Sequence, residues 1–274
     1  MKTKSGMMAL VVVLALALTV FLPVIDDTDD SYGAEDGSSD FYYSQLSSME
    51  KEVYAKILTK AESLDPSDLK IEFEESDFTL DRYPTLEECT KAFRALYYGH
   101  PEFFWLINTF AYPESGIMES MTLSFSADNA AELAEQKAAV NAAVSKITVD
   151  GEFTYDKVKQ IHNWIVENCR YDTEAVGSKE CPEAHNIYGI FVDKAAVCEG
   201  YARAFMYLCQ KNGIDCIVSI GQGVSDDGSE NHMWNYIQME DDVWYCMDVT
   251  WDDPLVNGSD SGEVYYSYFL KGTD

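Results

Sequence analysis

The sequence predicts an α+β fold in which helices come first and a sheet follows. Apolar residues recur at the three- and four-residue spacing of amphipathic helices in several stretches between about residues 41 and 212. Beyond that point, short runs rich in aromatic and β-branched residues are typical of strands. Because helical and strand-like segments are largely separated along the chain, we expect α+β architecture and not an alternating α/β one.

The composition is that of an acidic globular protein. The 274 residues are 47% hydrophobic and 24% charged, which is enough for one full core or two small ones and excludes a disordered chain. The 48 acidic and 19 basic residues give a net charge of −29. Such a surface repels phosphate backbones and anionic headgroups, so we expect no nucleic-acid partner and membrane contact only through the N-terminal segment.

Residues 1–34 carry the features of an export signal. Lys2 and Lys4 precede an uncharged apolar run over residues 7–25, which four aspartates follow. The run of 19 residues lies between a signal-peptide core and a full membrane span, so both a signal peptide cleaved after Ala34 and a membrane anchor are consistent with it. Either way we expect the rest of the chain to be extracellular or at the cell surface, after an acidic linker over residues 35–40.

Residues 41–149 form the first predicted region, which is mainly helical. Apolar spacing predicts helices over about residues 41–63, 85–98 and 129–147. An aromatic-rich segment follows the second helix, and residues 120–125 are a candidate strand. This region is either a substrate-access element or a packing partner for the rest of the chain.

Residues 150–274 form the second predicted region. A turn at residues 150–151 precedes an amphipathic helix over about residues 155–169, and a further helix over residues 198–212 ends at Gly213. Strand-like segments then predict the sheet. They lie at residues 214–220, 232–238, 243–250 and 263–270.

Two of these segments predict a hairpin centred on Glu240, in which His232 lies directly opposite Asp248. Directly opposed side chains project from one face with Cβ atoms roughly 5 Å apart. A slip of one residue would send Asp248 to the other face. A carboxylate that orients an imidazole is what a general base needs, although a structural His–Asp pair has the same pattern.

Cys198 stands at the first turn of the predicted helix over residues 198–212. The positive end of the helix favours the thiolate, and the unpaired N–H of this turn could stabilise an oxyanion. Gly200 and Ala202 are expected to keep the turn slim and leave room for a substrate. The alternative is that Cys198 is a core residue or half of a disulfide. If Cys198 is free, the other six cysteines allow up to three disulfides.

Three separated motifs together resemble the transglutaminase-like superfamily. They are VCEGYA at residues 197–202, HMWN at 232–235 and DVTWD at 248–252. In that superfamily such motifs hold a papain-like triad, which implies Cys198 as nucleophile, His232 as base and Asp248 as its orienting carboxylate. The resemblance further implies a papain-like core, with the nucleophile helix packed on an antiparallel sheet. It covers residues 150–270 well and 41–149 more loosely.

The chemistry that the resemblance implies is thiolate attack on an amide or ester carbonyl, which gives an acyl-enzyme. Water as acceptor makes a peptidase or amidase, an amine makes a crosslinking transglutaminase, and a binding module that keeps the fold is a third alternative. We expect an exported cysteine hydrolase acting on a protein, a peptide or a cell-envelope polymer. Tyr188 is a candidate second oxyanion donor. No cofactor or metal is expected, because zinc-ligand and EF-hand spacings are lacking.

Other candidate residues are expected to have structural roles. His162 lies among apolar residues of a predicted helix, whereas His100 and His185 lie in loop-like segments and are expected to be solvated. The tryptophans from residue 234 onward could line a substrate groove, but their strand spacing favours the core. The letters NGS at residues 257–259 form a glycosylation sequon.

Overall fold

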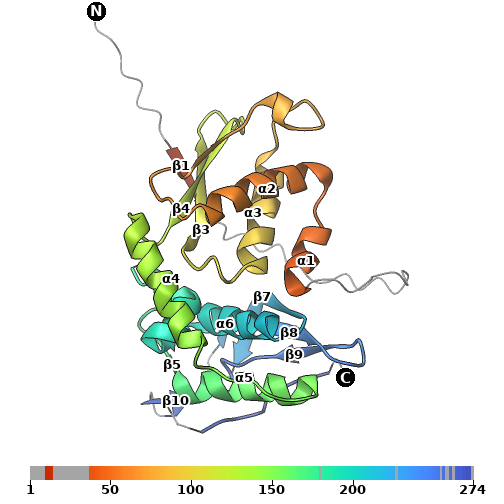
Figure 1. Ribbon diagram of the computed structural model, residues 1–274, viewed down its shortest axis with the longest axis vertical. Helices are drawn as coiled ribbons and strands as arrows, with labels where there is room; N and C mark the ends of the chain where they lie inside the picture. The colour runs from red at the N-terminus through yellow and green to blue at the C-terminus, as the bar shows by residue number, and fades with distance from the viewer. Residues whose placement is uncertain are drawn as a thin grey trace, which may run out of the picture. The chain divides into compact units, whose positions relative to one another are not determined.

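The computed structural model describes residues 10–14, 37–178, 180–225, 228–253, 255–256, 259–260 and 263–272. It confirms the α+β class, with the longest strands following the last long helix (Figure 1). The chain divides into two compact units. One contains Tyr42–Tyr97 and Trp105–Ala134, and the other contains Tyr98–Phe104 and Glu135–Asp274.

The first unit combines two helices, α2 (Ser48–Glu62) and α3 (Leu86–Gly99), with an antiparallel sheet. The Phe93 ring of α3 lies 5.3 Å from the Phe110 ring. The Trp105 Nε1–H donates a 3.1 Å hydrogen bond to the Ala61 carbonyl in α2. The helix α3 therefore contacts the strand that contains Phe110, and α2 contacts the residue that precedes this strand. The sheet, in order β1-β3-β4-β2, comprises Leu10–Leu14, Leu106–Pro113, Ser120–Phe125 and Lys70–Glu72, and a short 3-10 helix, η1, spans Glu75–Asp77.

The single helix expected over residues 41–63 is in fact two helices. The first, α1, spans Gly37–Ser44 and begins inside the segment expected to be a linker. The break has a local cause at Ser47, whose hydroxyl accepts from the Glu50 N–H while the Glu50 carboxylate accepts from the Ser47 N–H. A reciprocal capping box of this kind starts a new helix, here α2.

The sequence did not predict β2 or β3, whereas β4 has the predicted bounds. β2 has three residues, too few for a periodicity to be recognised. β3 shifts its register against β4 between Leu106 and Phe110. A bulge of this kind interrupts the alternation of inward and outward side chains by which a strand is recognised.

The second unit packs helix α6 (Cys198–Lys211) against α5 (Thr154–Asn168) and against a three-stranded antiparallel sheet. The sheet consists of β7 (Cys216–Ser225), β8 (Gly228–Gln238) and β9 (Trp244–Met247), in that order. Figure 1 shows α5 and α6 side by side next to these strands. The predicted helices over residues 155–169 and 198–212 are confirmed to within one residue.

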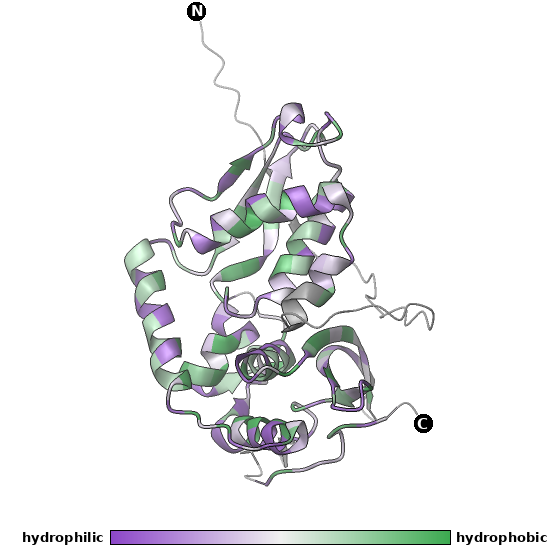
Figure 2. Ribbon diagram, turned by 45° about the vertical axis from the view of Figure 1, so that its right-hand side comes forward, coloured by the Kyte–Doolittle hydropathy of each residue, from purple (hydrophilic) through white to green (hydrophobic). Residues whose placement is uncertain are grey.

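A further long helix, α4, and several short elements complete the chain. Helix α4 leads into the second unit and buries Leu133, Val140 and Val144, with hydrophilic residues interspersed along it (Figure 2). It corresponds to the alanine-rich helix predicted over residues 129–147. The elements are α4 (Ala130–Val144), β5 (Arg170–Tyr171), η2 (Pro182–His185), η3 (Gly189–Asp193), β6 (Ala195–Ala196), β10 (Leu255–Val256) and β11 (Ser259–Asp260).

Helix α6 is buried along most of its length. A Cβ atom at Gly200 would lie 2.7 Å from the Ala184 carbonyl oxygen and 2.7 Å from the Ala196 Cβ. The glycine therefore allows the preceding chain to approach the first turn of α6. Ala202 is also buried. The expectation that these two small residues leave room for a substrate is wrong, because protein atoms fill that space.

Residues 263–270 do not form the expected strand. In this part of the described chain, Lys271 pairs with Cys246 in an isolated bridge. The segment is held instead by a hydrogen bond from the Asp248 N–H to the Tyr268 carbonyl and another from the Tyr265 N–H to the Asp252 carbonyl. Two of its aromatic residues, Tyr266 and Phe269, pack against the α5 helix around the His162 ring.

The expected export segment, apart from the five residues of β1, lies outside the described residues. So do residues 35 and 36 of the expected linker and residues 257 and 258 of the sequon. Among the helices that the structure describes, none combines the length and the apolar character needed to cross a bilayer.

Candidate functional site

Three side chains meet where α6 begins beside the sheet of the second unit. His232 projects from β8, Asp248 directly follows β9, and Cys198 is the first residue of α6. His232 Nε2 lies 2.6 Å from Asp248 Oδ2, and the imidazole is also hydrogen-bonded to the Cys198 thiol. The carboxylate thus occupies Nε2 and leaves Nδ1 for the sulfur. The structure brings together the three residues that the sequence motifs indicated.

The hairpin that carries this pair has a different register from the predicted one. Tyr236 pairs with Cys246 and Gln238 with Trp244, so the hairpin is centred on Asp241 and not on Glu240. The connection is longer than expected and contains Asp242 in the left-handed region, at φ 60°. This is a slip of two residues, which keeps every side chain on its predicted face. Asp248 lies beyond the end of β9 and reaches His232 diagonally.

A tight turn fixes the Asp248 carboxylate. Its Oδ1 accepts a 3.1 Å hydrogen bond from the Trp251 N–H, which leaves Oδ2 for His232. The Asp248 N–H donates to the Tyr268 carbonyl, and the Asp248 carbonyl accepts from the Asp252 N–H. Both carboxylate oxygens and both main-chain groups of Asp248 are therefore hydrogen-bonded, and the carboxylate has one orientation toward the imidazole.

Two indole rings flank the imidazole. The Trp251 ring stacks on His232 with centroids 4.9 Å apart, and the Trp234 ring lies 6.0 Å away. Both tryptophans are half-buried, so the expectation that they belong to the core is wrong. Gly223 on β7 permits this arrangement, because a Cβ there would lie 2.9 Å from the Trp251 ring. Aromatic faces stabilise a cation, which here would be the imidazolium.

The protonation of His232 follows from these surroundings. Burial lowers the pKa of the imidazole, but the hydrogen bonds to Asp248 and Cys198 outweigh it and raise the pKa to about 9. His232 therefore carries a positive charge at neutral pH. A cationic imidazole beside a sulfur is the state in which an ion pair with a thiolate forms.

Tyr171 is a residue of this site that the sequence motifs did not indicate. The parallel pairing of β5 with β6 places Tyr171 beside Ala196, two residues before Cys198. The phenolic oxygen is hydrogen-bonded to the main chain of Cys198, and burial raises the pKa of Tyr171, so the hydroxyl keeps its proton. The only sequence signal for Tyr171 was its place in the segment NCRYD at the end of α5. Its contact with Cys198 depends on the pairing of two-residue strands, which are too short to be recognised from a sequence pattern.

The other histidines and Tyr188 lie in different surroundings. The Tyr188 ring packs 6.1 Å from the Phe104 ring, and its N–H donates to the Asn186 side chain. His185 is half-buried and lies 3.2 Å from the Glu199 carboxylate, so it is not the solvated residue expected. His100 bonds to Glu102 at 2.8 Å.

Four of the remaining cysteines are buried, whereas Cys198 and Cys246 are partly exposed and Cys181 is exposed. All seven thiols are free. Burial raises the pKa of Cys89 and of Cys169 to about 12, and that of Cys246 to about 11. These thiols stay protonated near neutral pH and are poor nucleophiles. In the described part of the chain no group of histidine, cysteine and acidic residues could hold a metal ion.

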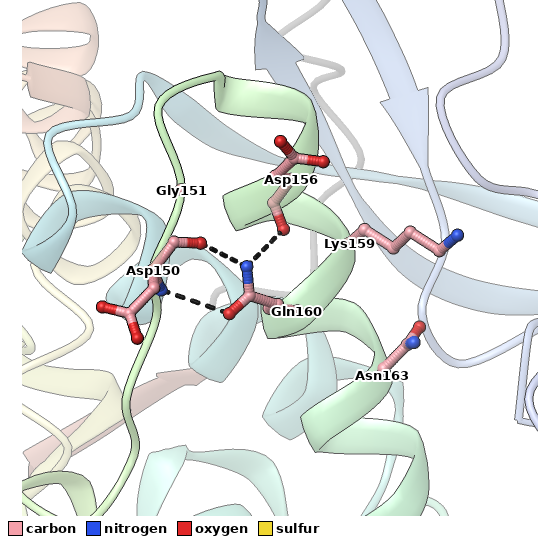
Figure 3. Close-up of a pocket in the computed structure, with 6 residues that line it drawn as sticks. All are labelled: Asp150, Gly151, Asp156, Lys159, Gln160 and Asn163. Atoms are coloured by element: carbon pink, nitrogen blue, oxygen red, sulfur yellow. Dashed lines mark hydrogen bonds between the residues drawn. The ribbon is translucent and has the colours of Figure 1, made fainter.

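A hollow of about 490 Å³ lies beside α5 and contains none of the three site residues. Figure 3 shows Gln160 bridging the main chain of Asp150 and of Asp156, while Lys159 and Asn163 point along the outer face of the helix. The Gln160 side chain closes the turn that precedes α5. This hollow has no cysteine or histidine in its lining.

The comparisons with known proteins concern the part of the chain that contains this site. Residues 141–249, a range that includes Cys198, His232 and Asp248, match the family model described as Transglutaminase-like superfamily. Kyphoscoliosis peptidase of Mus musculus is 28% identical over 164 residues, and that of Homo sapiens is 27% identical over 160 residues. These matches cover 55% and 54% of this chain but 24% of each relative, so the chain spans about a quarter of their length.

Among solved structures, one described as a TGase is 13% identical, with a TM-score of 0.36. The alignment covers 48% of this chain and 40% of that chain.

Proposed function

The chain belongs to the transglutaminase-like superfamily through residues 141–249, and from that premise we propose that it is an exported cysteine hydrolase of peptide or amide bonds. One observation carries the proposal. A thiol at the start of α6 is hydrogen-bonded to an imidazole whose other nitrogen lies 2.6 Å from a fixed carboxylate. We assign Cys198 as nucleophile, His232 as acid and base, and Asp248 as the residue that orients His232.

Acylation would begin from the ion pair between the Cys198 thiolate and the His232 imidazolium. The sulfur attacks the carbonyl carbon of the substrate, and the carbonyl electrons move onto its oxygen. When the tetrahedral intermediate collapses, the carbon–nitrogen bond breaks and His232 donates its proton to the leaving amine. Asp248 holds the ring in one tautomer throughout, which is the role of the carboxylate in such triads.

The oxyanion would be stabilised by the Cys198 N–H together with the Tyr171 hydroxyl. The Cys198 N–H belongs to the first turn of α6 and therefore has no partner within the helix. The Tyr171 oxygen is hydrogen-bonded at that position in the free protein, and a rotation of its O–H would let it donate to the oxyanion. Tyr171 replaces Tyr188 in this proposed role, because Tyr171 lies against Cys198.

Hydrolysis of the acyl-enzyme would complete the cycle. Neutral His232 removes a proton from water, the hydroxide attacks the thioester carbon, and the Cys198 thiolate leaves. The peptidase names of the mouse and human relatives favour water as acceptor over an amine. The export signal predicted for residues 1–34 favours an extracellular protein, peptide or cell-envelope polymer as substrate.

A peptide library incubated with the wild type and with Cys198→Ala tests the proposal by mass spectrometry. We expect cleaved peptides with the wild type alone. Cys181→Ala is the matched control, since Cys181 is an exposed cysteine outside the site and its removal should leave cleavage unchanged. Amine-linked products without cleavage would assign a transglutaminase instead. If no product forms and iodoacetamide labels Cys198 no faster than Cys181, the protein is a binding module.

A further inference from the structure

Two consecutive carboxylates, Asp252 and Asp253, are buried directly after the turn that carries Asp248. Their exposed fractions are 0% and 4%. Burying a carboxylate is costly unless it is hydrogen-bonded or paired, so each position needs a specific partner. The partners belong to two different helices.

Asp253 connects the turn to the nucleophile helix. Its Oδ2 accepts a 2.6 Å hydrogen bond from the Tyr201 hydroxyl, and the Tyr201 side chain is fully buried. Tyr201 stands three residues after Cys198, one helical turn further along α6. The bond therefore joins the first turn of α6 to the segment that carries Asp248.

Asp252 connects the same turn to α5. Its Oδ2 lies 3.2 Å from His162 Nε2, and neither side chain is exposed. Its Oδ1 accepts a 2.8 Å hydrogen bond from the Tyr268 N–H. The His162 ring is enclosed by Tyr266, stacked at 5.4 Å, and by Phe269, edge-on at 5.2 Å. This pair therefore joins α5, the turn and residues 265–269.

Hydrogen bonds within the turn link Asp252 and Asp253 to the residue Asp248. The Asp252 N–H donates to the Asp248 carbonyl, and the Asp253 N–H donates to the Thr250 carbonyl. The N–H of Trp251, the residue before Asp252, donates to Asp248 Oδ1. A shift of either buried carboxylate would therefore rotate Asp248 relative to His232.

We propose that Asp252 and Asp253, with His162 and Tyr201, are positioning residues that clamp the Asp248 turn between α5 and α6. The clamp sets where Asp248 holds His232 relative to the sulfur of Cys198. This inference rests on the proposed function, because it assigns a purpose to the distance between the thiol and the imidazole. Small displacements within a catalytic constellation lower rates strongly, by about a hundredfold for 1 Å.

Tyr201→Phe tests the clamp with the smallest change, since it removes one hydroxyl. We expect it to lower kcat about tenfold to a hundredfold with KM nearly unchanged. It should also slow the alkylation of Cys198 by iodoacetamide and shift the pH dependence of that reaction. Tyr207→Phe is the matched control on the same helix, away from the turn, and should leave both rates unchanged.

Two substitutions at the carboxylate separate positioning from general stability. Asp253→Asn keeps an oxygen that accepts from Tyr201 and should retain most of the wild-type kcat, whereas Asp253→Leu should behave like Tyr201→Phe or worse. His162→Gln, which keeps a donor near Asp252, should fall between them. Thermal unfolding of each variant shows whether it is folded at the assay temperature.

The outcomes distinguish the clamp from the catalytic proposal. If folded Tyr201→Phe matches the wild type in kcat and in its alkylation profile, the clamp is overturned while the triad stands. If the wild type itself neither turns over substrate nor shows accelerated labelling of Cys198, the proposed function is overturned, and the clamp with it.

Discussion

The second unit contains two buried pairs of an imidazole and a carboxylate, and they differ in what surrounds them. His232 and Asp248 are 2.6 Å apart, and the imidazole has a thiol as its further partner and indole rings beside it. His162 and Asp252 are 3.2 Å apart, fully buried, and enclosed by Tyr266 and Phe269. The same two residue types thus form a candidate proton-transfer pair in one place and a buried structural contact between packed segments in the other.

The difference teaches that the pair itself does not determine its role. The His–Asp pattern alone favoured a structural pair over a catalytic one, and the second pair in this molecule fits that description. What distinguishes the first pair is the nearby sulfur at a helix N-terminus, which interacts with the imidazole. A nucleophile and its base, not a histidine and a carboxylate, identify a site of this kind.

The largest expected difference between the two pairs is in the loss of catalytic activity when their residues are replaced. We expect Cys198→Ala and His232→Ala each to lower kcat/KM by about 10⁴-fold, because residues that act as one unit each remove nearly all of the catalysis. The corresponding change in the second pair, His162→Gln, should cost at most about a hundredfold. Steady-state kinetics on a cleaved peptide measure all three, and an equal loss at both histidines would show that the two pairs do not differ in kind.

Asp248→Asn should have the next largest effect, about a 10³-fold loss in kcat/KM with a change in pH dependence. The carboxylate helps to raise the pKa of His232 to about 9, so its removal lowers that pKa. The imidazolium is lost above its pKa, and the alkaline limb of the rate should therefore move from about pH 9 toward lower pH. A pH–rate profile measured for both proteins tests this, and an unmoved limb would assign that limb to another group.

The stability of the protein should also depend on His232 through pH. The pKa is raised from an ordinary 6.5 to about 9 in the folded state. Its contribution is therefore fully present below about pH 6.5 and is lost as the pH rises through about 9, amounting to about 3 kcal/mol. The difference in free energy of unfolding between the wild type and His232→Gln should shrink over that window in urea titrations. Tyr207→Phe serves as the control, for which no comparable decline is expected.

The sequence predicted the parts of this site that depend on local pattern. The helix that begins at Cys198 has its predicted start, and His232 and Asp248 lie on the same face, because face depends only on the parity of the register. The predicted register was wrong by two residues. The length of the connection depends on the left-handed conformation of Asp242, which the amino-acid sequence around it does not specify.

The parts that the sequence did not predict depend on contacts between distant segments. Tyr171 reaches Cys198 only because two-residue strands pair 25 positions apart along the chain. The segment after residue 263 resembles a strand, but its Tyr266 and Phe269 pack around His162 of α5, which is hydrogen-bonded to the buried Asp252. In the first unit, the register shift in β3 interrupts the alternation of inward and outward side chains, so the sequence pattern did not indicate a strand there. Pattern alone contains no information on such tertiary partners.

Tyr171→Phe should have a smaller effect than the triad variants, about tenfold to a hundredfold on kcat/KM, because it removes one of two proposed oxyanion donors. The ring remains to pack against Tyr201, 6.3 Å away, so the protein should stay folded. The loss should appear in kcat, since the donor acts on charge that develops in the transition state. A larger KM with unchanged kcat would assign Tyr171 to substrate binding.

The smallest effect is expected at Gly223, which allows the Trp251 ring to lie over His232. A Cβ at this position would meet the ring at 2.9 Å and the His232 Cβ at 3.1 Å, so Gly223→Ala must displace the indole. We expect a threefold to tenfold loss in kcat/KM, about 1 kcal/mol, because the stacked ring supports the imidazolium but does not exchange protons. Gly272→Ala is the matched control, since nothing lies within 4 Å of its Cβ position. If both alanines behave like the wild type, the indole stack contributes nothing to the difference between the two imidazole–carboxylate pairs, and that difference depends on the thiol alone.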